Sequence, residues 1–169
     1  ILATAAVGGL HRQITPGDLV IVDSFMDFTS GRPSTFFDGD DARVVHVDMT
    51  QPYCPTLRRA LLAAGESAST RLHPRGCYVC TNGPRYETPS EVAAFAKLGG
   101  DVVGMTGLPE VVLARELGLC YASVALVTNF GAGLAPGPLG HEQVVQTMQS
   151  CGLSVGGLLR DALHGLQGA

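Results

Sequence analysis

Apolar runs bounded by glycine, proline and polar residues recur along the chain and predict buried β-strands. The run from Ile1 to Val7 ends at Gly8-Gly9, and the runs Asp18–Phe25 and Cys120–Thr128 are continuous rather than alternating. Continuous apolar strands are typical of a sheet that is covered on both faces. Shorter strands are predicted at residues 43–47, 76–81 and 101–104.

Four segments between these strands carry apolar residues at helical spacing. In the segment 55–64, Leu57, Leu61 and Leu62 share one face and Gly65 provides a stop. Further helices are predicted at 89–98, 109–117 and 141–166, the last with the glycine pair 156–157 as a candidate break. Segments rich in glycine and proline predict loops at 26–41 and 130–140.

Strands that alternate with helices predict an α/β fold with a mixed, largely parallel central sheet flanked by helices. The chain of 169 residues suffices for a single domain over residues 1–169 with a sizeable core. It starts at Ile1, inside a predicted buried strand and without an initiator methionine. Because such a strand needs neighbours, we expect a fragment of a longer protein that lacks its N-terminal part.

Composition argues against several classes of partner. Only 15% of residues are charged, the net charge is -4, and no cluster of lysine and arginine forms a nucleic-acid groove. No apolar run approaches the roughly 20 residues that cross a bilayer, so no membrane partner is expected. The five cysteines lie among apolar neighbours and indicate reduced thiols in a cytoplasmic protein. Cys77 and Cys80 lie three apart on a predicted strand, which disfavours a shared metal or redox site.

Small and polar residues follow several predicted strands, where α/β folds bind ligands. They occur at Thr4–Gly9, Asn82–Glu87, Met105-Thr106 and Thr128-Asn129. No spacing of histidine, cysteine or carboxylate residues predicts a metal site, and no phosphate loop with its lysine is present. We therefore expect a small-molecule enzyme with neither metal nor cofactor.

Glu87 lies just before a predicted helix whose start is explained without it. Thr88, Pro89 and Glu91 have the spacing of a helix N-cap with a capping box. This pattern leaves Glu87 and its neighbour Arg85 open to a functional role.

The candidate residues at other strand and helix ends each have a structural alternative. Asn129 is either a turn residue or an amide that presents both a donor and an acceptor to a ligand. His141, at the start of the last helix, is either a cap or a ligand contact, and His46 is equally open. The other histidines are expected at the surface: His11, His73 and His164.

Five segments together resemble the family of trimeric purine nucleoside phosphorylases and methylthioadenosine phosphorylases. They are TAAVGGL (4–10), PGDLVIVDSFMDFTSGRP (16–33), NGPRYETPSE (82–91), DVVGMTGLPEVVLARELGLCYASVALVTN (101–129) and GHEQVV (140–145). The resemblance spans nearly the whole chain in order. It also implies an N-terminal portion with a glycine-rich phosphate loop and a basic Arg-His segment, which this sequence does not contain. We therefore expect incomplete phosphate binding by this chain alone.

The resemblance implies a role for each matching position. Asn129 is the catalytic amide that meets O6 and N7 of a purine, and Glu87 accepts hydrogen bonds from its N1 side. The remaining implied contacts are Tyr86, Met105, Thr128 and His141 for the nucleoside, Ala6 and Thr106 for phosphate, and His46, Phe36 and Phe37 for a neighbouring subunit of a homotrimer.

The implied reaction is reversible phosphorolysis of a purine nucleoside to free base and ribose 1-phosphate, with phosphate as co-substrate. Charge develops on the departing purine, and a hydrogen bond from Asn129 to N7 strengthens as it does so. Positioning phosphate against C1′ supplies much of the remaining rate, without a covalent nucleophile.

Three readings of the substrate and function stay open. Glu87 with Asn129 favours 6-oxopurines, because adenine-type relatives carry aspartate at the second position. His141 favours inosine and guanosine, whereas the segment HVDMTQPYCP (46–55) is closer to the methylthioadenosine branch, so 5′-methylthioinosine and 5′-methylthioadenosine remain alternatives. A truncated, non-catalytic subunit that only assembles is the alternative of a different class.

Overall fold

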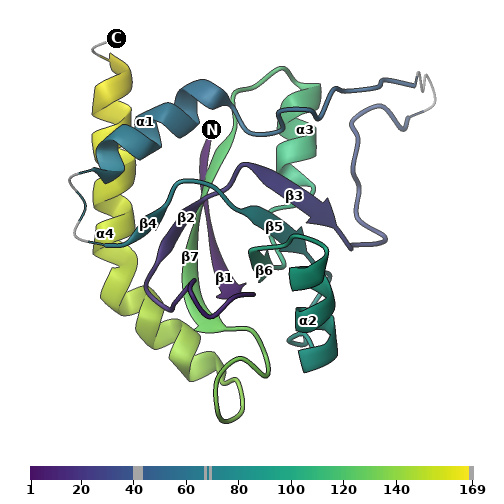
Figure 1. Ribbon diagram of the computed structural model, residues 1–169. Helices are drawn as coiled ribbons and strands as arrows, with labels where there is room; N and C mark the ends of the chain where they lie inside the picture. The colour runs from purple at the N-terminus through teal and green to yellow at the C-terminus, as the bar shows by residue number, and fades with distance from the viewer. Residues whose placement is uncertain (40–43, 67, 69, 168–169) are drawn as a thin grey trace.

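The computed structural model describes residues 1–39, 44–66, 68 and 70–167, which form one sheet with helices packed against it (Figure 1). The strands are β1 (Leu2–Gly9), β2 (Leu19–Ile21), β3 (Ser24–Asp27), β4 (Leu72–His73), β5 (Cys77–Cys80), β6 (Val102–Gly104) and β7 (Ala122–Phe130). The helices are α1 (Pro55–Gly65), α2 (Pro89–Lys97), α3 (Glu110–Glu116) and α4 (His141–Gln167).

The strands lie in the order β3-β5-β6-β1-β7-β2-β4. Four neighbouring pairs are parallel, namely β3·β5, β5·β6, β1·β7 and β2·β4. The pairs β1·β6 and β2·β7 are antiparallel. The prediction of a mixed, largely parallel sheet flanked by helices is therefore confirmed.

The single strand predicted at 18–25 is wrong, because the chain divides there into β2 and β3. β2 pairs with β4 at one edge of the sheet, and β3 pairs with β5 at the other. Asp23 lies between them, and its backbone N–H donates to the Gly76 carbonyl at 3.2 Å while its carboxylate accepts from the Gly76 N–H at 3.1 Å. The segment β2–β3 and the segment β4–β5 therefore run side by side from one edge of the sheet to the other, and this pairing curls the sheet. The two-residue strand β4 was not predicted, since it is too short for any periodicity.

The central strands are buried on both faces, which explains their continuous apolar sequences. In β2, Leu19 and Ile21 pack with Leu61 of α1 and with the buried face of α4. Val20 lies on the opposite face, in a cluster that contains Val111 of α3. A third cluster joins α2 to the sheet through Val92, Phe95, Val79 and Val103. In Figure 1, α1 and α4 accordingly lie together on one side of the sheet.

Helix α4 continues through Gly156 and Gly157, so the candidate break there is wrong. Val155, Leu158 and Ala162 of this helix are buried against the sheet, and this packing offsets the roughly 1 kcal/mol that each glycine costs in a helix. No helix in the described part of the chain is long and apolar enough to cross a membrane.

The strand predicted at 43–47 is also wrong for the residues that the structure describes. Residues 44–47 form no strand, and Arg43 lies outside the described residues. A short β-like sequence without a neighbouring strand cannot pair its backbone groups, so local propensity alone does not produce a strand there.

Candidate active site

A cavity of about 210 Å³ lies where β6 and β7 end beside β1. Its lining contains seven of the residues singled out in the sequence, and they come from four separate segments: Ala6, Tyr86, Glu87, Met105, Thr106, Thr128 and Asn129. Val144 of α4 and Leu139 of the preceding loop also line it, and sequence reasoning missed both. An apolar residue in the first turn of a helix gives no signal of its own, although Val144 lies within the GHEQVV segment.

Strand directions decide which parts of each strand reach this cavity. β7 runs parallel to β1, but β6 runs antiparallel to it, with Gly8 opposite Val103. The chain leaving β6 therefore passes alongside the interior of β1, and Ala6, Val7 and Gly8 of β1 all line the cavity. Thr4, one of the residues expected at a strand end, does not line it and instead lines two other hollows.

A β-bulge at the end of β7 places two consecutive polar side chains in the lining. Val7 pairs with Val127 and Gly8 with Asn129, so Thr128 is an extra residue on β7. In a regular strand Thr128 and Asn129 would point to opposite faces. Bulges commonly redirect side chains beside active sites, and here both residues line the cavity.

Hydrogen bonds fix the orientation of the Asn129 amide. The Thr128 hydroxyl lies 2.9 Å from Asn129 Oδ1, and Asn129 Nδ2 donates to the Phe130 carbonyl at 2.9 Å. The residue is only 8% exposed, so both bonds are protected from solvent. One hydrogen on Nδ2 and one acceptor direction on Oδ1 remain for a ligand.

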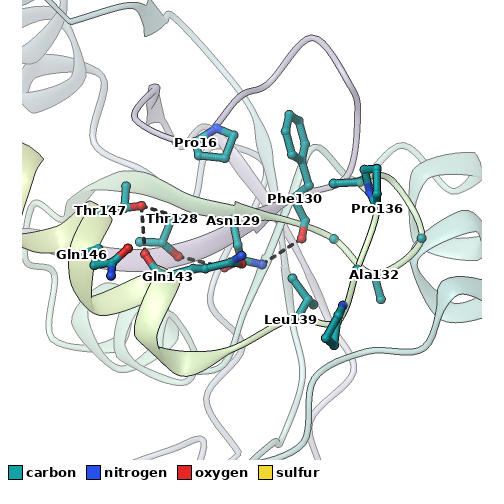
Figure 2. Close-up of a pocket in the computed structure, with 15 residues that line it drawn as sticks. Pro16, Thr128, Asn129, Phe130, Ala132, Pro136, Leu139, Gln143, Gln146 and Thr147 are labelled. Atoms are coloured by element: carbon teal, nitrogen blue, oxygen red, sulfur yellow. Dashed lines mark hydrogen bonds between the residues drawn. The ribbon is translucent and has the colours of Figure 1, made fainter.

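Asn129 also lies in the wall of an adjoining cavity of about 300 Å³ (Figure 2). In Figure 2, Thr128 and Asn129 at the end of β7 lie beside the start of α4, whose Gln143 and Thr147 also line this cavity. The Thr147 hydroxyl donates to the Thr128 carbonyl at 3.1 Å and so ties the start of α4 to the end of β7. Thr128 therefore contacts the Asn129 amide through its hydroxyl and α4 through its carbonyl.

The capping box predicted at the start of α2 is confirmed, and it also accounts for Arg85. Thr88 Oγ1 accepts from the Glu91 N–H, and Glu91 accepts from the Thr88 N–H. Arg85 donates two hydrogen bonds of 2.8 Å to the Glu91 carboxylate. These bonds, with that from Thr88, lower the pKa of Glu91 to about 2. Arg85 therefore has a structural partner, whereas Glu87 takes no part in the cap.

Glu87 faces the cavity from the loop that follows β5. Its Oε1 accepts a hydrogen bond of 2.8 Å from the Thr81 hydroxyl. Thr81 directly follows β5, so this bond attaches the Glu87 carboxylate to the end of the sheet. Because one oxygen is bonded to Thr81, the other is free to meet a donor on a ligand.

Arg32 anchors the loop that carries Glu87, and sequence reasoning did not single it out. Its guanidinium donates to the carbonyls of Leu108, Thr81 and Asn82 at 2.5, 3.2 and 3.4 Å. Gly83 follows with φ of +68°, and a Cβ there would lie 2.3 Å from Met105 Sδ. Only glycine combines that backbone conformation with the close approach of Met105.

The turn at Thr106 is held by a buried phenol. Tyr78 Oη accepts hydrogen bonds of 3.2 Å from the backbone N–H groups of Thr106 and Gly107. Burial raises the pKa of Tyr78, which keeps the phenol neutral. A Cβ at Gly104 would lie 2.3 Å from this oxygen, so the contact requires glycine. Nothing in the sequence distinguishes Tyr78 from an ordinary core aromatic of a strand.

We expect Tyr78→Phe to loosen the Thr106 turn. The substitution removes the acceptor of two backbone N–H groups while keeping the ring that packs in the core. Leaving these partly buried donors without their acceptor costs about 1 kcal/mol, so the midpoint of denaturant unfolding should fall measurably. Tyr53→Phe is the matched control, since Tyr53 is equally buried but does not touch this turn. Equal midpoints for Tyr78→Phe and the parent protein would contradict this role.

Four predicted contact residues lie outside the cavity. His141 is exposed at the first position of α4 and lines neither cavity, although Val144 in the same turn does. His46 is exposed as well. Phe36 is 53% exposed over an apolar hollow that Leu117 also lines, and Phe37 is half-buried. Their implied contacts to a nucleoside or a neighbouring subunit remain predictions.

The expectation that His73 is a surface residue is wrong. Its side chain is 17% exposed, and its Nε2 lies 2.7 Å from Asp18 Oδ2. Burial acts to raise the pKa of Asp18, but hydrogen bonds from His73 and Thr15 outweigh it and lower the pKa. The pair ties β4 to the start of β2, because His73 belongs to β4 and Asp18 directly precedes β2.

The cysteines are free thiols in the described structure. Cys77 and Cys80 both lie on β5, as predicted. Within the described ranges no group of three or more histidine, cysteine and carboxylate side chains is placed to hold a metal ion.

A family model described as the phosphorylase superfamily matches residues 1–164. The chain therefore belongs to the phosphorylase superfamily. The sheet and the cavity described above agree with this membership.

Individual relatives within this superfamily are similar to the chain over most of its length. The chain is 53% identical over 154 residues to the 6-oxopurine nucleoside phosphorylase of Pyrococcus furiosus, a match that covers 88% of this chain and 58% of the relative. It is 54% identical over 148 residues to a probable S-methyl-5′-thioinosine phosphorylase of Methanothermobacter thermautotrophicus, covering 88% of this chain and 50% of that protein. The chain thus spans between half and two-thirds of the length of these relatives.

Solved structures share the fold. Methylthioadenosine phosphorylase from Schistosoma mansoni in complex with adenine superposes with a TM-score of 0.93 at 33% identity, covering 100% of this chain and 65% of that chain. A mutant of the adenosine/methylthioadenosine phosphorylase from the same organism, in complex with tubercidin, gives 0.94 at 33% identity over 100% of this chain and 66% of that one. The predicted nucleoside phosphorylase-like fold is confirmed.

Proposed function

We propose that this protein catalyses the reversible phosphorolysis of 6-oxopurine nucleosides to free purine base and ribose 1-phosphate. The observation that carries the proposal is that Glu87 and Asn129, from segments 42 residues apart, line one small cavity. The names of relatives at about half identity point to the same reaction.

The two side chains match the hydrogen-bonding edge of a 6-oxopurine. Such a base presents a donor at N1 and acceptors at O6 and N7. The free oxygen of Glu87 accepts from N1–H, and the free hydrogen on Asn129 Nδ2 is available to O6 or N7. A 6-aminopurine instead presents an acceptor at N1, which a carboxylate repels. A buried polar mismatch of this kind can discriminate between substrates by several decades.

Cleavage breaks the bond between C1′ and N9, and its electron pair moves onto the purine. A phosphate oxygen forms the new bond to C1′, which gives ribose 1-phosphate, and the proton that HPO4²⁻ gives up passes to the purine anion to form the free base. The negative charge that develops on the base reaches N7, where a hydrogen bond from Asn129 becomes stronger in the transition state than in the ground state. Such a differential interaction raises the rate of the chemical step.

The rest of the lining suits the sugar and the phosphate. Met105 offers an apolar surface to the ribose, Tyr86 covers the base, and Thr128 holds the amide beside it. Thr106 and Ala6 are exposed at the mouth of the cavity, where a hydroxyl and a backbone N–H can bind phosphate. These assignments follow the family resemblance at the matching positions.

Phosphorolysis of 5′-methylthioinosine is the second candidate. One observation favours it: His141, the expected partner of a ribose 5′-hydroxyl, does not line the cavity, whereas the apolar Val144 does. The relative from Methanothermobacter with that name is about as similar as the 6-oxopurine enzymes.

Assembly into a homotrimer is part of the proposal. Phe36, with Phe37 and His46 nearby in the sequence, would contribute to the site of a neighbouring subunit. The exposure of Phe36 over an apolar hollow supports such a contact, since an exposed apolar patch commonly marks an interface. A non-catalytic assembly subunit is the alternative reading of the same surface.

The test measures release of free base from inosine, guanosine, adenosine and their 5′-methylthio analogues, with and without phosphate. It uses the whole gene product beside residues 1–169. We expect release from 6-oxopurine nucleosides only when phosphate is present, and the preference at the 5′ position then separates the two candidates. If the whole gene product is folded but releases no base from any of these nucleosides, the proposal is wrong and the non-catalytic alternative remains.

A further inference from the structure

Thr81 stands outside the cavity yet bonds directly to the residue that is proposed to recognise the base. Its hydroxyl donates to Glu87 Oε1 at 2.8 Å. Thr81 directly follows β5 and does not line the cavity that holds Glu87 and Asn129. Among the described residues it is the one hydrogen-bond donor to the Glu87 carboxylate.

The backbone of Thr81 is held from both sides. Its N–H donates to the Gly104 carbonyl of β6 at 2.9 Å, and its carbonyl accepts from Arg32 at 3.2 Å. The Thr81 hydroxyl is therefore a fixed point of the sheet, whereas Glu87 belongs to a loop and its neighbours Tyr86 and Thr88 are exposed. A side chain on a loop loses conformational freedom when it binds, and a fixed hydrogen bond removes part of that cost in advance.

We propose that Thr81 is a positioning residue that selects 6-oxopurines by holding the Glu87 carboxylate toward the base. This inference rests on the proposed function and deepens it. With Oε1 bonded to Thr81, Oε2 is the oxygen presented to N1–H. Thr81 and Glu87 both line a neighbouring hollow of about 370 Å³, so the bond holds Oε1 on that side. Without the hydroxyl, the carboxylate can rotate and no longer presents a fixed oxygen to the base.

The test compares Thr81→Val, which removes the hydroxyl at nearly the same volume, with Thr81→Ser, which keeps it. For inosine we expect Thr81→Val to lower kcat/KM about 10-fold, the effect of one hydrogen bond to a charged group, mainly through a higher KM. Thr81→Ser should restore most of the loss. Adenosine, which lacks N1–H, should change little, so the ratio of inosine to adenosine use falls. Thr29→Val, which removes a hydroxyl that does not contact Glu87, is the matched control.

A double-mutant cycle separates positioning from a general effect on the fold. Thr81→Val should have no further effect on inosine use when Glu87 is already alanine, because the hydroxyl then has no carboxylate to orient. Equal losses for inosine and adenosine, or an undiminished loss in the Glu87→Ala background, would overturn the inference while leaving the proposed function intact. If the parent protein neither cleaves inosine nor binds hypoxanthine in calorimetry, both proposals fall together.

Discussion

Replacing Asn129 by alanine is expected to lower kcat for inosine about 100- to 1,000-fold, the usual cost of losing one donor aimed at developing charge. The amide is already oriented by Thr128 and Phe130, so it need not reorganise as the base departs. The substitution removes a hydrogen bond that strengthens in the transition state, and KM should change much less than kcat.

Gln143→Ala provides the matched control for this prediction. Gln143 also carries an amide, but it lines the adjoining cavity and is absent from the lining of the proposed base site. Its loss should leave turnover near that of the parent protein. Thermal unfolding should show that Asn129→Ala remains folded, since the residue contributes two neutral hydrogen bonds of about 1 kcal/mol each. Near-normal turnover by Asn129→Ala would remove the residue from the mechanism.

Replacing Glu87 by alanine is expected to lower kcat/KM for inosine and guanosine by about 100-fold, because a charged partner of the base is lost. Adenosine should be used no worse than before, since no carboxylate then opposes its N1 acceptor. The melting temperature should change little, because Glu87 is half-buried and, among the described residues, its carboxylate makes one hydrogen bond, to Thr81.

Substrate ratios rather than single rates decide this second prediction. Glu91→Ala is the control, because it deletes a carboxylate of the same loop and helix that caps α2 and binds Arg85. We expect Glu91→Ala to lower the melting temperature while preserving the inosine to adenosine ratio. The opposite pattern, in which Glu87→Ala reduces both nucleosides alike, would show that Glu87 supports the fold and does not read the base.

The contrast between Glu87 and Arg85 shows how far local sequence reasoning reaches. The capping box at Thr88 was predictable because every interaction in it spans three residues. The partner of Arg85 was not assigned, although Glu91 lies only six residues away, because a loop of unknown shape separates them. Thr81 and Tyr78 gave no signal at all, since their roles come from hydrogen bonds to a loop and a turn that pack against them.

The sequence by itself determined the four helices and the long buried strands β1 and β7, because apolar periodicity and caps act over a few residues. It also identified the polar residues that end up together at the cavity. The tertiary structure alone decided that β6 pairs antiparallel with the end of β1, that a bulge brings both Thr128 and Asn129 to the site, and that the strand predicted at 18–25 divides to curl the sheet. These outcomes depend on strand direction and register, which are set by contacts between residues far apart in the chain and therefore leave no local pattern.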